Sequence, residues 1–151
     1  MRNMKINRAF RIAALLLAVV MLLPVGAMAV ESRSSLYLDA YSAYVYPAGW
    51  GKVQVWFDVT GTDDMDEIGA LEIQLYESKD NTNWTWVKTF GYTNNSGMLG
   101  YDDWTHTGHV EYSGTIGRYY KAYVCIWAGK NGAGDTRYFW TSAKKATLFA
   151  A

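Results

Sequence analysis

Apolar and polar residues alternate with a period of two in several short segments of this chain. Residues 117–129 (GRYYKAYVCIWAG) place Tyr120, Ala122, Val124 and Ile126 on the face expected to turn inward. Alternation among β-branched and aromatic residues favours a strand over a helix. Residues 52–60 carry the cleanest example, in which Lys52, Gln54, Trp56, Asp58 and Thr60 alternate with Val53, Val55, Phe57 and Val59. We take residues 117–129 as the central strand.

The same reasoning predicts strands at residues 36–46, 70–78, 84–90, 109–113 and 136–143. Pro47 is expected to end the first of them, and Leu71, Ile73 and Leu75 are expected to point inward. Residues 61–69 read as an acidic loop, 91–108 as a long irregular loop and 144–151 as a tail. No segment of helical period follows residue 29. The fold class expected is therefore all-β, an antiparallel β-sandwich of about seven strands.

The N-terminal segment has the features of a secretory signal peptide. Four basic residues precede an apolar run at residues 12–23, which is too short to span a bilayer comfortably, and Ala27-Met28-Ala29 supplies a cleavage site. We expect cleavage after Ala29; an uncleaved N-terminal anchor is the alternative. The domain organisation expected is a signal peptide at 1–29, a flexible leader at 30–35 and a single β-sandwich domain at 36–149, secreted to the extracellular space.

Loss of the signal changes the charge. The full chain has 14 basic and 14 acidic side chains, and residues 1–29 remove four basic ones and no acidic one. A mildly acidic domain lacks the clustered basic surface that nucleic acid requires. No second apolar stretch follows, so no membrane partner is expected after cleavage. Cys125 is the single cysteine, so a disulfide within the chain is excluded. We expect Cys125 to be a small, partly buried residue.

Aromatic residues are the main candidates for binding. The chain has 7 Trp and 12 Tyr. Flat exposed rings stack on sugar faces, and neighbouring Asn, Asp or Gln side chains bond the hydroxyl groups. The predicted ligand-binding residues lie in turns, hairpins and loops: Trp50, Trp84, Trp86, Tyr101 and Trp104. The alternative is that these rings cover a thin core and brace hairpins across strands.

Metal binding and catalysis have weaker candidates. Asp63, Asp64, Asp66 and Glu67 offer oxygen ligands for Ca²⁺ without the spacing of an EF-hand, and solvated loop acids are the alternative. No other cofactor is expected. His106 and His109 lack a matching third metal ligand in the sequence, and Cys125 lacks a neighbouring base. The sequence therefore predicts a protein that is not an enzyme.

Two resemblances extend this interpretation. The segment GRYYKAYV at residues 117–124, followed by a Gly-rich turn and a closing strand, resembles the late hairpin of fibronectin type III and other immunoglobulin-like domains. The resemblance implies an immunoglobulin-like sandwich and a hydrogen bond from Tyr120 to upstream backbone. The chain departs from that family in lacking a Pro-rich opening strand.

The processed chain also resembles a family of small exported Gram-positive bacterial proteins described only as a domain of unknown function. Six segments carry the resemblance: residues 35–39 (SLYLD), 56–61 (WFDVTG), 65–69 (MDEIG), 83–85 (NWT), 97–101 (GMLGY) and 138–142 (YFWTS). This resemblance implies export from such a bacterium and no particular activity.

Three functions are consistent with these features. The leading one is a secreted or cell-surface binding module that holds a glycan or a protein surface with aromatic loops. The alternative is a structural exported protein that associates with itself through edge strands. A small hydrolase is third, and it would require two carboxylates within catalytic distance in one cleft. The sequence leaves the oligomeric state open.

Overall fold

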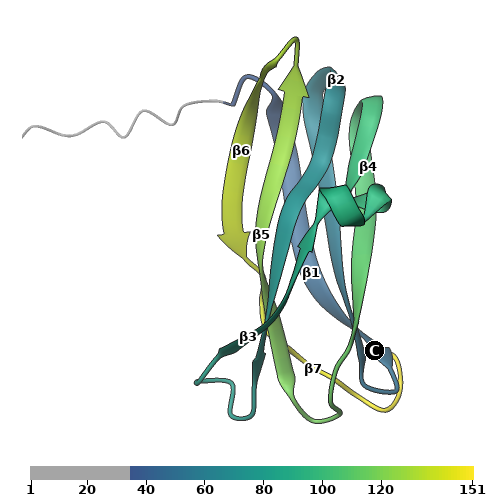
Figure 1. The fold of residues 1–151 in the computed structure, drawn as a ribbon, viewed down its shortest axis with the longest axis vertical. Helices are drawn as coiled ribbons and strands as arrows, with labels where there is room; N and C mark the ends of the chain where they lie inside the picture. Colours follow the sequence, from purple (N-terminus) through teal and green to yellow (C-terminus); the bar gives the residue numbers. More distant parts are fainter. Residues whose placement is uncertain (1–34) are drawn as a thin grey trace, which may run out of the picture. The chain divides into compact units, whose positions relative to one another are not determined.

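The computed structural model describes residues 35–151, which form one curled antiparallel sheet (Figure 1). Its strands are β1 (Leu38–Gly49), β2 (Lys52–Ser78), β3 (Thr85–Gly91), β4 (Leu99–Ser113), β5 (Tyr119–Lys130), β6 (Ala133–Trp140) and β7 (Lys144–Lys145). Two short 3₁₀ helices, η1 (Tyr92–Asn94) and η2 (Ser96–Met98), precede β4. The predicted all-β class is confirmed. The predicted signal peptide at 1–29 and residues 30–34 of the predicted leader lie outside the described residues. Within 35–151, no helix has the length and apolarity needed to cross a membrane.

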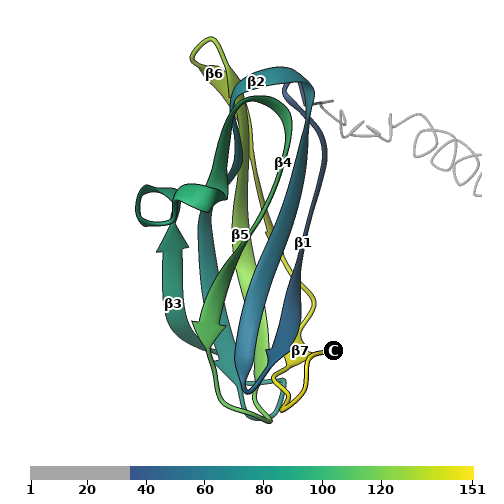
Figure 2. The same ribbon diagram turned by 90° about the vertical axis from the view of Figure 1, so that its right-hand side faces the viewer.

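β2 organises the sheet, because it pairs with four other strands. Residues 52–60 of β2 lie between β1 and β4, residues 67–69 lie between β4 and β5, and residues 72–77 lie between β5 and β3. Figure 2 shows β1, β2 and β4 running side by side. β5 also has strands on both sides, β2 and β6. The predicted central strand is thus internal to the sheet, but the longer β2 holds the larger number of partners.

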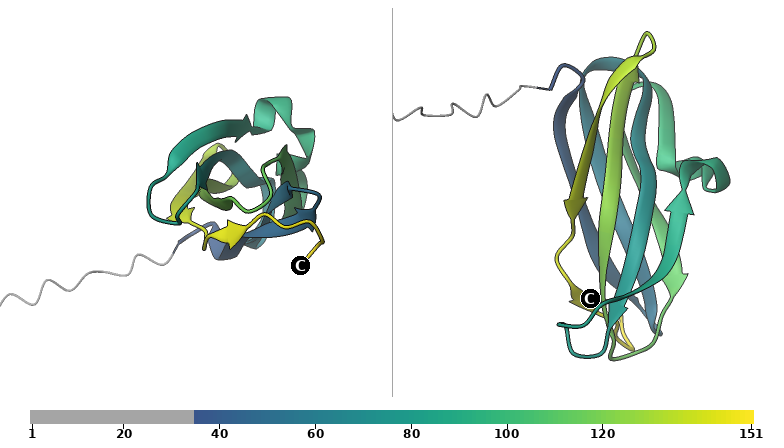
Figure 3. Two further views of the ribbon diagram at one scale, coloured as in Figure 1. Left: turned by 90° about the horizontal axis from the view of Figure 1, so that it is seen from below. Right: turned by 60° about the vertical axis from the view of Figure 1, so that its left-hand side comes forward.

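The core lies inside the curl of the sheet, which is visible from below in Figure 3. All eight side chains that the alternation in 52–60 and 117–129 assigned to the interior are buried, and they join one cluster: Val53, Val55, Phe57, Val59, Tyr120, Ala122, Val124 and Ile126. Alternate residues of a strand face opposite sides of the sheet. The residues between these buried ones therefore lie on the outer face.

Residues 61–69 are part of β2 and not the acidic loop that was expected. The pairing of β2 with β4 shifts register between Thr60 and Met65, where β2 passes from one half of the sheet to the other. Met65 and Ile68 are buried in the core there. A Cβ on Gly61 would lie only 2.8 Å from Cγ of Met65, so glycine lets the chain turn tightly over that side chain. The prediction failed because the many acidic side chains in this segment masked the two core residues, Met65 and Ile68.

A bulge corrects the prediction for Leu71. The pairing of β2 with β5 sets Ala70 opposite Ile126 and Glu72 opposite Cys125, so one residue of β2 is extra. Ala70 takes the inward position and Leu71 is only half-buried, whereas Ile73 is buried as predicted. A bulge changes the phase of the alternation, which a period of two cannot reveal.

The predicted hairpin of β2 and β3 is present, and its turn depends on Asp80. The Asp80 carboxylate accepts hydrogen bonds from the backbone N–H groups of Thr82 (2.9 Å) and Asn83 (2.8 Å), and Asn81 has a φ of 61°. Residues 91–108, expected to be an irregular loop, are irregular only through η2. β4 begins at Leu99 and includes the short strand predicted at 109–113.

Residues 144–151 are not a free tail, because they join the ends of β5 and β1. Ala146 donates its N–H to the Arg118 carbonyl (2.8 Å), and Trp50 donates its own to Leu148 (2.8 Å). Pro47 does not end β1: it pairs with Val53, and its carbonyl accepts from Ala151. Proline is tolerated there because β1 is an edge strand. The N–H group that Pro47 lacks is not needed for a hydrogen bond within the sheet.

The hydrogen bond expected of Tyr120 is present. Its hydroxyl accepts from the backbone N–H of Thr115 (2.8 Å) and donates to Glu77, whose other carboxylate oxygen accepts from Arg118 (2.9 Å). The Tyr120 ring is fully buried. Desolvation, and next the bond to Glu77, raises the pKa of Tyr120 from its usual 10.0 to about 12.

We predict that Tyr120→Phe lowers the free energy of unfolding by about 1–2 kcal/mol, since it leaves Glu77 without a buried donor. Tyr119→Phe is the matched control, because that ring lies on the outer face. Because folding favours the protonated phenol, this contribution is present below pH 10 and lost as pH rises toward 12. Urea denaturation from pH 7 to 11.5 measures both effects. Equal losses in the two variants would contradict the assignment.

Candidate binding surface

Aromatic side chains gather on the outer face of β3, residues 67–78 of β2, β5 and β6. Strand alternation places them there: Leu75 is inside the core, so Gln74 and Tyr76 point outward. The register sets Tyr76 beside Lys121 and Trp86, and Tyr123 beside Trp140. Six rings form what we call the aromatic face: Tyr76, Trp84, Trp86, Tyr123, Tyr138 and Trp140.

Lys121 lies between two rings of the aromatic face. Its Nζ is 4.4 Å from the ring centroid of Trp84 and 4.4 Å from that of Trp140. Trp140 also contacts Tyr123 (centroids 4.9 Å apart) and Tyr76 (5.0 Å). An exposed cation–π contact contributes about 0.5–1 kcal/mol. Lys121 therefore orders the rings on both sides of it before any ligand arrives.

Much of the aromatic face is open to solvent. Trp86, Tyr138 and Trp140 retain 56%, 61% and 49% of their accessible surface. Large rings that remain this exposed contribute little burial to the core, and a contiguous group of them is typical of an interaction surface.

A row of polar groups runs along β2 beside the rings. The Tyr76 hydroxyl donates to Oε1 of Gln74 (3.0 Å), and Nε2 of Gln74 donates to Glu72 (2.7 Å). Ring faces with an ordered phenol, amide and carboxylate at one edge suit a ligand that has both apolar faces and hydroxyl groups.

The structure separates the five residues predicted to bind ligand. Trp84 and Trp86 belong to the aromatic face. Trp50 lies in the turn between β1 and β2, where its backbone contacts residue 148. Tyr101 and Trp104 are exposed on β4, on either side of Asp103, which pairs with Met65 at the opposite end of the sheet. The five therefore do not form one surface.

Sequence reasoning missed the rings in the middle of the aromatic face. Tyr76, Tyr123, Tyr138 and Trp140 belong to regular strands, whereas the prediction looked to turns and loops. The signal was present in part, because the alternation that turns Ala122 and Val124 inward leaves Tyr123 on the opposite face. What the sequence could not supply is the order of strands, which sets β6 beside β5 and β5 beside β2.

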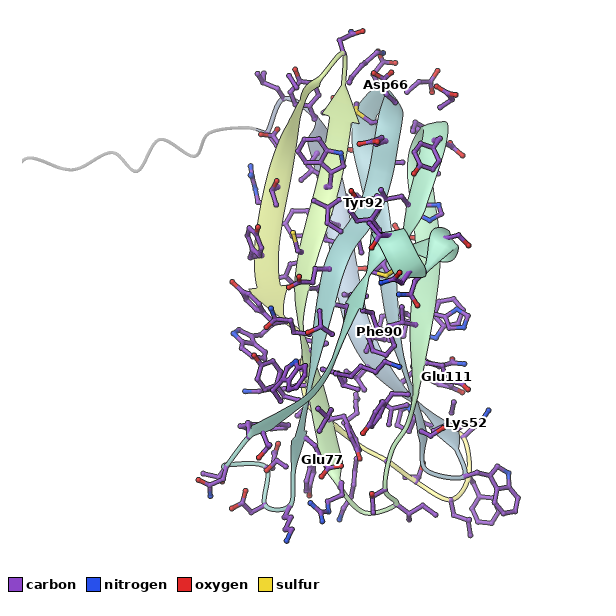
Figure 4. All side chains as sticks on the ribbon, viewed as in Figure 1. Lys52, Asp66, Glu77, Phe90, Tyr92 and Glu111 are labelled. Carbon is purple, nitrogen blue, oxygen red and sulfur yellow. The ribbon has the colours of Figure 1, made fainter. Side chains whose placement is uncertain are left out.

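The four acidic residues 63, 64, 66 and 67 lie at the end of the sheet marked by Asp66 in Figure 4. Asp63 accepts from Lys130 (2.8 Å), which is the main cause of the lowered pKa of that carboxyl group. Asp66 accepts from the backbone N–H of Asn131 (2.6 Å). Within 35–151, no group of three or more His, Cys, Asp or Glu side chains is placed to hold a metal ion. Two of the four acids thus bind the β5–β6 hairpin.

The histidines and Glu111 have structural partners. A ring nitrogen of His106 lies 2.9 Å from the Gly97 carbonyl, and His109 stacks on Trp56 with centroids 4.3 Å apart. Glu111 accepts from Lys52 (2.8 Å), which lowers the pKa of that carboxyl group. His109 and Glu111 lie on the outer face of the sheet, opposite Trp56 and Gln54. His106 pairs with the buried Val59 and lies on the inner side, where its ring is 5.9 Å from that of Phe57.

No protein-family model matches the chain, and a search of curated proteins finds no significant match. The resemblance to immunoglobulin-like domains and the resemblance to exported Gram-positive proteins both remain predictions.

Cys125 gives a prediction of its own. It is buried, and desolvation raises the pKa of its thiol. We expect a thiol-specific disulfide reagent at pH 7.5 to modify native Cys125 much more slowly than the same residue in denaturant, because little thiolate forms in the fold. Spectroscopic release of the reagent's chromophore measures both rates. Similar rates would show a reactive thiol.

Proposed function

We propose that this protein is a secreted or cell-surface binding module that holds a carbohydrate chain across the aromatic face and performs no catalysis. The observation that carries the proposal is one ordered surface in which Tyr138 and Trp140 are exposed beside the polar row of Tyr76, Gln74 and Glu72. Sugar rings offer C–H faces for stacking and hydroxyl groups for hydrogen bonds. The rings are held by neighbours, so little ordering free energy is lost on binding.

The tilt of the rings favours a single twisted chain over a flat crystalline surface. Trp140 is inclined by 41° to Tyr123 and by 60° to Tyr76, whereas Tyr123 and Tyr138 are within 22°. A flat polymer surface would require rings in one plane. A soluble polysaccharide can turn its successive sugars to meet faces of different inclination.

An immunoglobulin or fibronectin type III-like sandwich and export after cleavage at Ala29 belong to the same proposal. Two inner faces packed on each other and the Tyr120–Thr115 hydrogen bond support the first. The basic and apolar N-terminal segment supports the second.

The test is affinity electrophoresis of the chain from Val30 onward in gels that contain soluble polysaccharides, followed by calorimetry with oligosaccharides of the one that retards it. We expect Trp140→Ala and Tyr138→Ala each to weaken binding by about fivefold or more, since truncation of a central aromatic anchor costs more than about 1 kcal/mol. Tyr101→Ala is the control, because that ring is equally exposed but lies on β4.

Failure of every polysaccharide to retard the parent, or equal retardation of the Trp140 variant, would refute carbohydrate binding at this face. Sedimentation velocity distinguishes carbohydrate binding from the alternative function, self-association of a structural protein. Concentration-dependent association that Trp140→Ala abolishes would instead make the aromatic face a contact between copies of this chain.

A further inference from the structure

Four exposed apolar side chains meet at the end of the sheet where β2 begins. They come from three segments far apart in sequence and form what we call the apolar tip: Trp50, Ile116, Leu148 and Phe149. Trp50 and Phe149 keep 79% and 76% of their accessible surface. None of the four belongs to the aromatic face, so the apolar tip is a separate surface.

Backbone hydrogen bonds hold the three segments together. Trp50 donates its N–H to Leu148 (2.8 Å) and Gly51 donates to Thr147 (3.1 Å). Gly117, next to Ile116, donates to Ala146 (2.8 Å). The apolar tip is therefore a built surface and not a set of loose loop ends.

The backbone at Trp50 is strained. Its φ is 54°, a left-handed conformation that costs a bulky residue about 1–2 kcal/mol. Glycine would adopt this φ without the cost, as Gly49 and Gly51 do on either side. Burial of the Trp50 ring does not offset this cost, because the ring is mostly exposed. A strained position that presents a large apolar side chain to solvent points to a role in binding.

The surface beside the tip combines an apolar hollow with positive charge. A shallow hollow of about 550 Å³ is lined by Ile116, Leu148 and Phe149, with Lys145 also at its wall. The salt bridges of residues 35–151 neutralise Lys52 through Glu111 and Arg118 through Glu77. They leave Lys145 and its neighbour Lys144 without a carboxylate partner.

Negative charge lies at the other end of the sheet. Figure 4 places Asp66 at the end opposite Lys52 and Glu77. Five further acids flank it in sequence or across the β2–β4 pairing: Asp63, Asp64, Glu67, Asp102 and Asp103. Lys130 is the basic residue that forms a salt bridge there. A negatively charged surface would therefore attract the tip and repel the opposite end, which orients the molecule.

We propose that the apolar tip binds the surface of an anionic lipid bilayer, with Trp50 and Phe149 in the interface and Lys144 and Lys145 on the headgroups. A lipid offers both an acyl chain for the hollow and a phosphate for the lysines. Trp is enriched at membrane interfaces, and apolar area together with basic residues determines peripheral binding. The sequence predicted no membrane partner because it has no second apolar stretch that could span a bilayer. The attachment proposed here is peripheral and requires no spanning segment.

The test uses the chain from Val30 onward, since the run at residues 12–23 is itself apolar and residues 35–151 belong to one compact unit. Vesicles of phosphatidylcholine, with or without phosphatidylglycerol, are sedimented with the protein. We expect phosphatidylglycerol to raise the partition coefficient of the protein by about thirtyfold, since each of the two lysines contributes about 1 kcal/mol near an anionic surface. Brominated lipids should quench tryptophan fluorescence in the bound protein.

Variants separate the two contributions. Trp50→Ala should lose most of the binding and the quenching. Trp104→Ala is the matched control, because that exposed ring lies at the acidic end, and it should bind as the parent does. Lys144→Ala with Lys145→Ala should bind neutral and anionic vesicles alike.

Absence of binding to anionic vesicles, or equal binding by Trp50→Ala, would overturn the proposal. Concentration-dependent sedimentation without vesicles that Trp50→Ala abolishes would also overturn it, because the tip would then dock on another copy of the chain. Polysaccharide retardation of Trp50→Ala reports separately on the aromatic face.

Discussion

Everything in this fold depends on bringing the inward faces of two halves of one strand, β2, against each other. The chain has a single cysteine, so no disulfide within it can hold the halves together. The apolar side chains of residues 52–60 bury their surface only if those of residues 67–78 and β5 cover them. The bend over Met65 makes this arrangement possible. The curl of the sheet and the positions of its edges follow from that bend.

The same alternation that builds the core also builds the aromatic face. Each buried residue of β5 fixes an outward neighbour, so Ala122 and Val124 place Lys121 and Tyr123 on the other side. The proposed binding surface thus needs no loop of its own, because its rings project from the strands that form the core. Rings held by neighbouring side chains suit a ligand that must be met by prearranged surfaces.

Sequence reasoning predicted the regular parts of the fold and missed those that depend on pairing. The inward faces of residues 52–60 and 117–129 could be predicted because nothing interrupts their period. The bulge at Leu71 and the passage of Pro47 through an edge strand are set by partners, which the sequence does not name. The binding residues were sought in loops for the same reason: rings on four separate segments become neighbours only once strand order is known.

The junction between residues 144–151 and β1 has a consequence for how the molecule assembles. The hydroxyl of Tyr46 bonds the carbonyl of a residue 105 positions later in the chain. Contacts of such separation form slowly, because a long loop must close before they add any stability. Closure of this end of the sheet must therefore wait until residues 144–151 have been made, and earlier intermediates expose the ends of β1 and β5 to chaperones and proteases.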